Sequence, residues 1–353
     1  MKIISLCVAA ALSLTGTAAA QTRLLRFPDI HGDKVVFTYA GDLWTAPVSS
    51  GVGGAAARLT AHPGLEQFAR FSPDGKWIAF TGQYDGDEQV YVVPSTGGVP
   101  RQITWYPARG PLPPRWGYDN QVINWTRDGK AVLFRSMRDG WAMADTRLYT
   151  VPLDGSLGEA LPMPVSGAAD FSPDGKQVVY TPSARDFRTW KRYQGGWQQD
   201  LYLFDLATHE TKNITSNPRN DRDPMWIGEK IYFTSDRTGT LNLYVYENGK
   251  VDPVTQSKQW DVRWPGSDGV GRIVYEMNGE LHVLDTNTRQ DRQIPIQVPY
   301  DGLYDRPSQV SAADNIEDWA LSPKGERALF TARGDIFTVP IEKGPTRNLT
   351  HSS

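Results

Sequence analysis

A short turn sequence recurs along the chain and limits its fold more than any other feature. Two full copies read Phe-Ser-Pro-Asp-Gly-Lys, at residues 71–76 and 171–176. Proline presets φ, aspartate caps its own backbone and glycine accepts a positive φ, so the motif favours a tight turn between antiparallel strands. Its glycine and those of the shorter copies lie 43, 54, 46 and 53 residues apart, and then 97, which is two periods with a degenerate copy near Gly269-Val270-Gly271. These glycines are Gly32, Gly75, Gly129, Gly175, Gly228 and Gly325.

Each turn begins a repeated unit of strand-forming segments. A β-branched or aromatic run such as 77–80 follows the turn, then a second strand such as 89–91, and most units close with a short element such as 102–104. The chain contains seven such units, and a tandem repeat of strand–turn–strand units of this length is typical of β-propeller blades. Runs that are apolar on both faces need cover on both sides, which neighbouring blades provide and a β-sandwich does not. No segment has a helical pattern that would suggest a doubly wound α/β fold.

The seven units are not evenly spaced. Six of them occupy residues 24–298, the interval 299–316 breaks the rhythm, and the seventh begins again at 317 and continues to 353. The repeats alone allow two arrangements: one seven-bladed ring, or a six-bladed ring followed by the first blade of a longer array.

The first twenty residues read as an export signal. Lys2 supplies a positive charge, residues 3–14 are apolar, and Ala18 and Ala20 occupy the positions that a signal peptidase reads. We expect cleavage after Ala20 and a periplasmic or secreted location. The apolar stretch is shorter than the roughly 20 residues that span a bilayer, and a retained membrane anchor is the alternative. The only cysteine, Cys7, lies in this stretch, so disulfides are not expected in the mature chain.

Composition and motifs exclude several kinds of function. The 37 basic and 40 acidic residues leave a net charge of −3, which offers no footprint for nucleic acid. Gly-x-Ser-x-Gly is absent, and Asn213 stands where a zinc helix beginning at His209 would need its second ligand. The glycine-rich segment 51–56 is not followed by a helix, and the acidic segment 84–88 is more typical of a solvated loop than of a calcium site. We therefore expect no cofactor, no metal and no catalytic residue.

Two inserts exceed the length that a blade requires. The first, 105–121, is rich in proline and aromatic residues, and the second, 183–199, combines arginine and lysine with tyrosine and tryptophan. Guanidinium groups beside aromatic rings suit a peptide carboxylate. Packing against other domains is an equally good interpretation.

Several segments together resemble the tricorn protease family. They are the opening 24–37 with Gly41-Asp42-Leu43-Trp44, the segment 101–104, the Trp-Lys-x-Tyr-x-Gly-Gly stretch at 190–196, and 332–340. The resemblance implies a six-bladed propeller, then a seven-bladed one, a PDZ module and a carboxy-terminal serine peptidase domain that trims oligopeptides. It thus implies an all-β fold for this chain: a six-bladed β-propeller of four-stranded antiparallel blades over 24–298, a linker over 299–316, and the first blade of a second propeller over 317–353.

The same resemblance suggests where substrate would bind. In tricorn-like enzymes a pair of arginines on the loop after the second blade is thought to hold the carboxylate at the substrate's terminus. The matching loop here is the first insert, in which Arg115 is the best positional match and Arg109 the second. The two are not adjacent, which departs from the family's paired arrangement.

Two functional hypotheses follow. In the first, the chain is the non-catalytic propeller of an exported tricorn-like serine peptidase, which gates or anchors peptide substrates for PDZ and peptidase domains and is inactive alone. In the second, it is a stand-alone periplasmic propeller of the TolB-like kind that binds protein partners. Neither hypothesis involves nucleic acid or, after signal cleavage, a membrane, and both leave a homo-oligomer open.

Overall fold

The computed structural model describes residues 22–49, 54–107, 117–140, 145–184, 187, 191–299 and 310–351. The chain forms two compact units, Met1–Pro299 and Tyr300–Ser353. The expected signal sequence and its cleavage site lie outside the described residues. Among the residues that are described, no helix has the length and apolar character needed to cross a bilayer.

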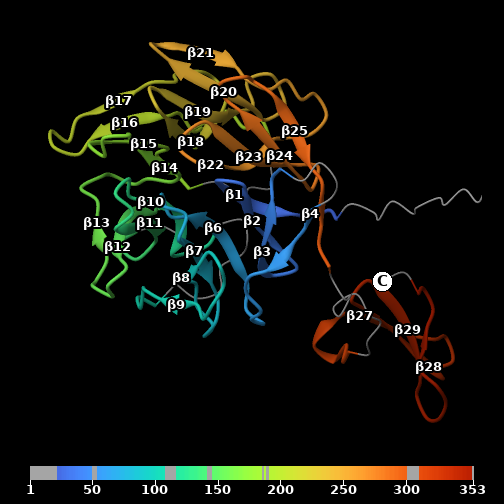
Figure 1. The fold of residues 1–353 in the computed structure, drawn as a ribbon. Coiled ribbons are helices and arrows are strands. Elements are labelled where there is room, and N and C mark those ends of the chain that lie inside the picture. The colour runs from blue at the N-terminus through green and yellow to red at the C-terminus, as the bar shows by residue number, and fades with distance from the viewer. Residues whose placement is uncertain are drawn as a thin grey trace, which may run out of the picture. The chain divides into compact units, whose positions relative to one another are not determined.

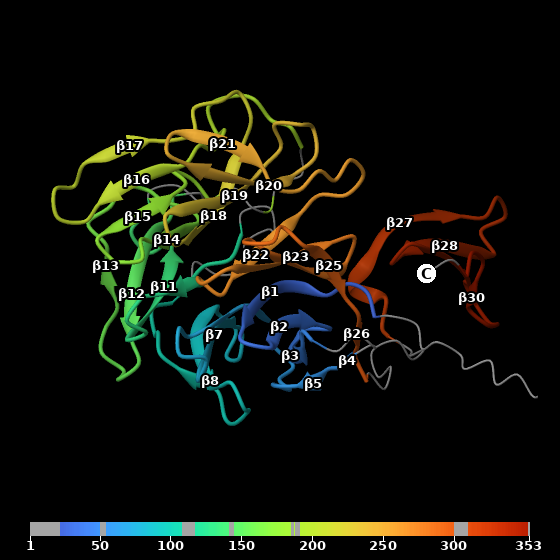
Figure 2. The ribbon, with the colours of Figure 1, turned by 45° about the horizontal axis from the view of Figure 1, so that its top comes forward.

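The first unit contains six four-stranded antiparallel sheets, each built from one continuous stretch of chain (Figures 1 and 2). We number these blades in chain order. Blade 1 is β1 (Arg26–His31), β2 (Lys34–Tyr39), β3 (Asp42–Pro47) and β5 (Ala57–Arg58); blade 2 is β6 (Glu66–Phe71), β7 (Trp77–Gly82), β8 (Gln89–Pro94) and β9 (Arg101–Gln102); blade 3 is β10 (Gln121–Trp125), β11 (Ala131–Ser136), β12 (Arg147–Pro152) and β13 (Glu159–Ala160). Blade 4 is β14 (Ala169–Phe171), β15 (Gln177–Tyr180), β16 (Tyr202–Asp205) and β17 (Thr211–Asn213); blade 5 is β18 (Asp221–Ile227), β19 (Lys230–Ser235), β20 (Asn242–Glu247) and β21 (Lys250–Pro253); blade 6 is β22 (Arg263–Ser267), β23 (Arg272–Met277), β24 (Glu280–Asp285) and β25 (Asp291–Ile294).

The recurring turn joins the first two strands of a blade, as its sequence predicts. In blade 2, Gly75 has a φ of +70° and its amide donates to the Ser72 carbonyl over 2.8 Å. The Asp74 carboxylate accepts hydrogen bonds from the Ser72 hydroxyl at 2.7 Å and from the Lys76 amide at 3.1 Å. Blade 4 repeats these contacts with Ser172 and Asp174. The turn therefore satisfies its own polar groups without help from the rest of the fold.

The short closing element of a unit holds the third strand through a threonine hydroxyl. Thr60 accepts the amide of Leu43 at 3.0 Å, and Thr104 accepts that of Val90 at 2.8 Å. The same bond recurs in blades 4 and 5. These hydroxyls complete backbone hydrogen bonding at a position where the outermost strand is only two to four residues long.

The core is divided into six apolar clusters, and each lies between two neighbouring blades. One cluster, for example, joins Val92 of blade 2 to Val132 and Phe134 of blade 3, all fully buried. Another joins Leu25 and Phe37 of blade 1 to buried residues of blade 6. The run 77–80 illustrates why the strands are apolar on both faces: Ile78 belongs to the cluster shared with blade 1, and Ala79 to the cluster shared with blade 3. The expected six-bladed propeller is thereby confirmed.

The ring is closed by a small extra sheet, because every blade already has its four strands. β26 (Ile296–Gln297) pairs in parallel with β4 (Gly54–Ala55), so the segment after blade 6 is bonded to the segment that precedes the last strand of blade 1. Ile296 is fully buried, and its carbonyl accepts the Thr22 amide at 3.1 Å. Closure thus depends on a two-residue parallel pair and on apolar packing between the blades.

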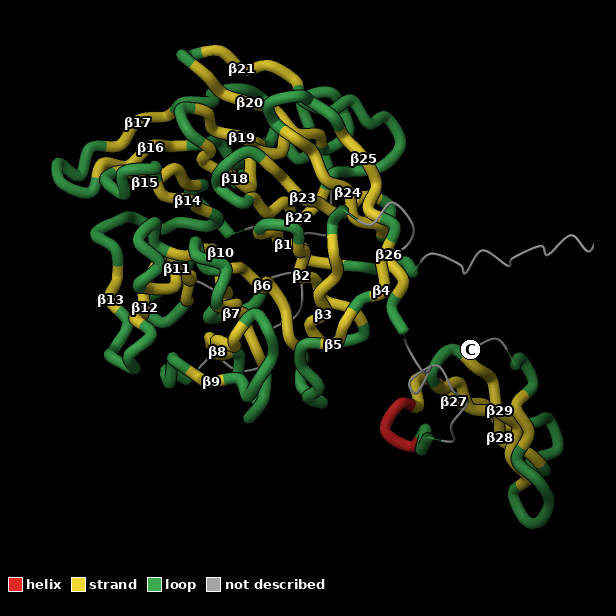
Figure 3. The backbone as a smooth tube through the Cα atoms, viewed as in Figure 1, coloured by secondary structure: helices red, strands yellow, loops and turns green. Residues whose placement is uncertain are grey.

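The second unit contains one further four-stranded antiparallel sheet: β27 (Ile316–Leu321), β28 (Arg327–Ala332), β29 (Asp335–Pro340) and β30 (Arg347–Asn348). It uses the same turn, with Gly325 at a φ of +67°, and Thr350 accepts the Ile336 amide at 3.0 Å. A short 3₁₀ turn, η2 (Ala313–Asn315), drawn red in Figure 3, precedes this sheet. The seventh repeat is therefore blade-like. Its assignment as the start of a second propeller, and the domain limits given above, remain predictions.

Candidate functional site

A bulge interrupts the innermost strand of four blades at the same place. The register shifts after Arg26 in β1, and at the matching points of β6, β18 and β22. The first bulged residue has a positive φ: +50° at Phe27, +56° at Phe68, +52° at Asp223 and +49° at Trp264. A left-handed conformation costs a bulky residue on the order of 1–3 kcal/mol, and such strain gathers at functional sites. The bulges re-aim these side chains.

Five aromatic side chains meet on the axis and form what we call the aromatic plug: Phe27, Phe68, Tyr118, Phe187 and Trp264. The ring of Phe27 lies 4.4 Å from that of Phe68 and 4.8 Å from that of Trp264, measured between centroids. Phe187 lies 4.9 Å from Trp264, and Tyr118 lies 5.3 Å from Phe187 in an edge-on arrangement. Blades 1, 2 and 6 therefore supply three rings, and each of the two inserts supplies one.

The second insert is fastened to blades other than its own. Past Phe187, the Lys191 ammonium pairs with the Asp261 carboxylate at 2.6 Å, and Arg192 Nε donates to the Gly239 carbonyl at 2.7 Å. The Tyr193 carbonyl accepts a hydrogen bond from the Asn220 amide group at 3.1 Å. This insert begins in blade 4 yet contacts blade 5 and the loop that leads to blade 6. These contacts hold the part of the insert that follows Phe187 against blade 5 and the loop that leads to blade 6.

Next to the plug, the residues two positions after the start of each bulge form one layer of the axis. In blades 1, 2 and 6 these residues are Asp29, Arg70 and Gly266. Arg70 extends from blade 2 to carbonyl oxygens on three other blades: Ile123 at 3.1 Å, Pro28 at 3.0 Å and Pro265 at 3.4 Å. Gly266 is the counterpart in blade 6, and a Cβ there would lie 2.5 Å from Asp29 Oδ1. Blade 6 therefore needs glycine so that Asp29 and Arg70 can occupy the axis.

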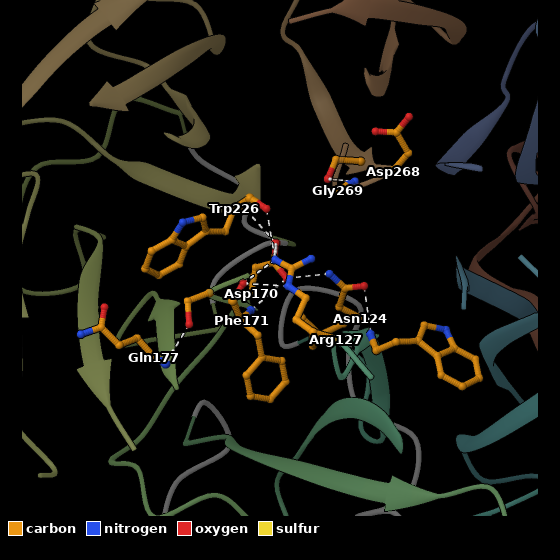
Figure 4. Close-up of polar contacts among 12 residues, drawn as sticks. Asn124, Arg127, Asp170, Phe171, Gln177, Trp226, Asp268 and Gly269 are labelled. Carbon is orange, nitrogen blue, oxygen red and sulfur yellow. Dashed lines mark hydrogen bonds and ion pairs between the residues drawn. The ribbon is translucent and has the colours of Figure 1, made fainter. Parts of the chain in front are cut away.

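A second arginine makes the corresponding tie on the other side. Arg127 Nη2 donates to Asp170 Oδ2 at 2.9 Å and to the Trp226 carbonyl at 3.1 Å, and Nε donates to the Phe171 carbonyl at 3.0 Å (Figure 4). Asp170 also accepts the Trp226 amide at 2.7 Å and the Asn124 amide group at 2.8 Å. Arg127 thus joins blade 3 to blades 4 and 5.

The two axial carboxyls feel opposing influences. Asp29 is 3% exposed, and burial raises its pKa to about 7 against the opposing effect of the Arg70 guanidinium. Burial also raises the pKa of Asp170, while Arg127 acts in the opposite direction. Both carboxyls accept backbone amides from the next blade, Asp29 from Phe71 at 2.7 Å. These charges are therefore part of the cross-blade bonding.

The axial cavity itself is small. It has a volume of about 60 Å³ and is lined by the innermost strands of all six blades, including plug residues Phe27, Phe68 and Trp264. At about 10–15 Å³ per enclosed water, that space suits roughly four to six waters. Within the described ranges, no group of three His, Cys, Asp or Glu side chains is placed to hold a metal ion. The arrangement suits binding or occlusion by aromatic rings.

The predicted substrate-binding residues cannot be placed in this site. Arg109 and Arg115 both lie outside the described residues. The inserts that carry the prediction do reach one site, through Tyr118 and Phe187. His282 stacks on Tyr275 with centroids 5.4 Å apart. This contact fits the structural role that its place in the repeat suggests.

Sequence reasoning missed the plug and the axial layer. Phe27, Asp223 and Trp264 each precede a proline inside an innermost strand. Proline within a strand marks an edge or a bulge, and its recurrence at one place in three repeats was the available signal. Nothing local identifies Arg70 and Arg127, whose acceptors are carbonyls on other blades.

Comparison with known proteins gives one consistent family. The model of the tricorn protease N-terminal β-propeller domain matches residues 22–290. Tricorn protease homolog 1 of Streptomyces coelicolor is 30% identical over 344 residues, covering 94% of this chain and 30% of the relative. The tricorn protease of Thermoplasma acidophilum is 25% identical over 328 residues, covering 90% and 29%. The crystal structure of the tricorn protease superposes with a TM-score of 0.75 at 23% identity, over 93% of this chain and 31% of that one.

One shorter match is to a protein of another name, and it covers only about a third of this chain. TolB of the Tol-Pal system from Francisella tularensis is 30% identical over 134 residues, which are 36% of this chain and 27% of that protein. The tricorn relatives match nearly the whole chain, which in turn spans about 30% of their length. The family model matches residues 22–290, well over half of the chain, so the chain belongs to the tricorn protease N-terminal β-propeller family.

Proposed function

We propose that this chain is the non-catalytic propeller portion of an exported tricorn-like serine peptidase that degrades oligopeptides, and that the aromatic plug gates peptide access to the axis. The observation that carries the gating role is the plug's construction. Both inserts add an aromatic ring to a cluster whose other members, Phe27, Phe68 and Trp264, line a cavity with room for only a few waters. In this proposal Phe187 is the ring that moves, because it lies on an insert, whereas the other three rings that line the axis lie within the innermost strands of blades 1, 2 and 6.

The plug also has the chemistry to contact peptides. Aromatic faces and edges bind apolar side chains, and the carbonyls and carboxylates beneath accept hydrogen bonds from backbone amides. Withdrawal of Phe187 would leave Phe27, Phe68 and Trp264 as an apolar rim around Asp29 and Arg70. A peptide would then exchange contacts with the plug for contacts with this rim. PDZ and peptidase domains of a longer product, and location in the periplasm or outside the cell, belong to the same proposal.

The test compares Phe187→Ala with Trp260→Ala, which removes an exposed tryptophan outside the plug. Binding of fluorescein-labelled oligopeptides to the 353-residue chain is measured by anisotropy, and peptide hydrolysis is measured in a longer product that carries a peptidase domain. We expect Phe187→Ala to accelerate peptide association and to change hydrolysis, and Trp260→Ala to alter neither. If both variants behave like the unaltered chain in both assays, the plug is not a gate.

The TolB-like hypothesis has one observation in its favour, the local match to TolB over 36% of the chain. It predicts protein partners without peptide hydrolysis in any longer product. If the longer product hydrolyses peptides and the 353-residue chain does not, the result supports the peptidase proposal instead.

A further inference from the structure

Three blades share a corner after their second strand. Residues 80–86, 134–140 and 233–239 each begin with Phe and end with Gly, and the fifth residue is Tyr84, Arg138 or Arg237. This residue packs on a tyrosine of the third strand. The Cζ atoms of Arg138 and Arg237 both lie 4.7 Å from the ring centroids of their partners, Tyr149 and Tyr244. The two arginines therefore occupy equivalent places in blades 3 and 5.

The two arginines differ in the side chain that accepts their hydrogen bonds, which is an aspartate in blade 5 and an asparagine in blade 3. In blade 5, Asp221 is paired with Ser235 and accepts two hydrogen bonds from Arg237 Nη2, at 2.9 and 2.8 Å. The register of blade 3 gives Asn120 the matching place, and its Oδ1 accepts Arg138 Nη2 at 3.0 Å. An amide oxygen thus replaces a carboxylate oxygen in nearly the same geometry. Arg237 has a counter-charge and Arg138 has a neutral acceptor.

The acids next to Asn120 and Arg138 in the sequence, Asp119 and Asp139, bind other groups. Asp119 directs its Oδ1 to the amides of Asn120 at 2.7 Å and Met137 at 2.9 Å, and Asp139 accepts the Tyr149 hydroxyl. Over the described part of the chain, no Asp or Glu oxygen forms an ion pair with Arg138 within 4.0 Å. Its Nε donates to the Ser136 hydroxyl at 3.1 Å. The guanidinium is held in place by hydrogen bonds, and no carboxylate among the described residues contacts its charge.

Arg138 also lines a surface pocket of about 190 Å³ between blades 2 and 3. Trp105 and Tyr106 line it from the start of the first insert, directly after blade 2, and Leu157 lines it from the loop between β12 and β13. Trp105 is 61% exposed and Leu157 is 87% exposed, while the Tyr106 ring centroid lies 4.5 Å from the Arg138 Cζ. Exposed apolar side chains around a fixed cation are typical of an interaction site.

We infer that this pocket binds a protein segment that presents an acidic side chain between apolar residues. The carboxylate pairs with Arg138, in the role that Asp221 has in blade 5, and the apolar neighbours cover Trp105 and Leu157. Because the apolar lining comes from two blades, a segment that continues in both directions covers more of it than a chain terminus does. This site is independent of the gate proposed for the axis.

The probe is a peptide capped at both ends, with one Glu between Leu and Phe, and its partner carries Gln at that position. Binding to the 353-residue chain is measured by titration with NMR or anisotropy up to millimolar peptide. We expect the Glu peptide to bind at least about tenfold more tightly than the Gln peptide, because charge-assisted hydrogen bonds are about twice as strong as neutral ones. Arg138→Met should abolish that preference.

A second variant tests the reasoning from blade 5. Asn120→Asp installs the missing counter-charge and should also remove the preference for Glu, while Lys130→Met, which deletes an exposed cation of the same blade, should leave it intact. Thermal unfolding of each variant establishes that it is folded. The inference is wrong if neither capped peptide binds, if Glu and Gln peptides bind equally, or if Arg138→Met retains the preference. Binding that requires a free peptide carboxyl terminus also overturns it.

Discussion

Removing the Arg127 guanidinium tests whether the propeller is held together along its axis. Arg127→Met deletes the donors to Asp170, to the Trp226 carbonyl and to the Phe171 carbonyl, at 2.9, 3.1 and 3.0 Å. Asp170 is 1% exposed and would keep its charge in a buried place. Loss of one partner of a buried ion pair costs about 3–5 kcal/mol, a large part of the roughly 5–15 kcal/mol that stabilises a typical protein.

The free energy of unfolding is measured by urea titration at pH 7.5 and followed by tryptophan fluorescence. The variants are Arg127→Met, Asp170→Asn and the double variant, with Lys130→Met as a surface control. We expect the double variant to be more stable than Arg127→Met, because no uncompensated charge remains buried. Burial already raises the pKa of Asp170 and Arg127 opposes that rise, so without Arg127 the pKa rises further. The deficit of Arg127→Met should therefore shrink as the pH is lowered and Asp170 is protonated.

The reasoning is refuted if Arg127→Met loses less than about 1 kcal/mol, since a neutral hydrogen bond alone accounts for that. It is also refuted if the losses of the two single variants simply add, because residues in one network must show coupling.

Two further predictions concern the same layer of the axis. The pKa of Asp29 is raised from 3.8 to about 7, so the folded state binds the proton more tightly than the unfolded state does. The contribution of this group to the unfolding free energy therefore falls as the pH rises from about 4 to about 7, and stays constant above pH 7. Asp29→Asn should remove that slope from a pH series of urea titrations, and an unchanged slope would contradict the assignment. Gly266→Ala should lower the thermal midpoint, because its Cβ would lie 2.5 Å from Asp29 Oδ1 and 2.7 Å from the Pro28 carbonyl oxygen, whereas Gly196→Ala meets open space and should not. Equal thermal midpoints for the two alanine variants would show that a Cβ at residue 266 is accommodated without strain, which would contradict this prediction.

The blade was predictable from the sequence because its determinants are local. The turn around Gly75 satisfies its own hydrogen bonds. The run 77–80 is apolar on both faces, which predicts that another sheet packs on each side of it. The candidate site was less predictable. The inserts were identified by their length and composition, but the selection of Phe187 and Tyr118 for the plug depends on how they meet rings from blades 1, 2 and 6.

The sequence by itself determined the repeat and its turn chemistry, since each depends on residues within one period of the chain, and the segments that resemble the tricorn family supplied the six-bladed count. Only the tertiary structure decided what fills the axis. Ring closure brings Arg70 within hydrogen-bonding distance of Pro265, 195 residues away, and Arg127 within reach of Trp226, 99 residues away. The same closure leaves Arg138 beside an amide where its counterpart has a carboxylate. Contacts of this kind depend on where separate blades place their backbone carbonyls and side chains, and no pattern of neighbouring residues encodes that placement.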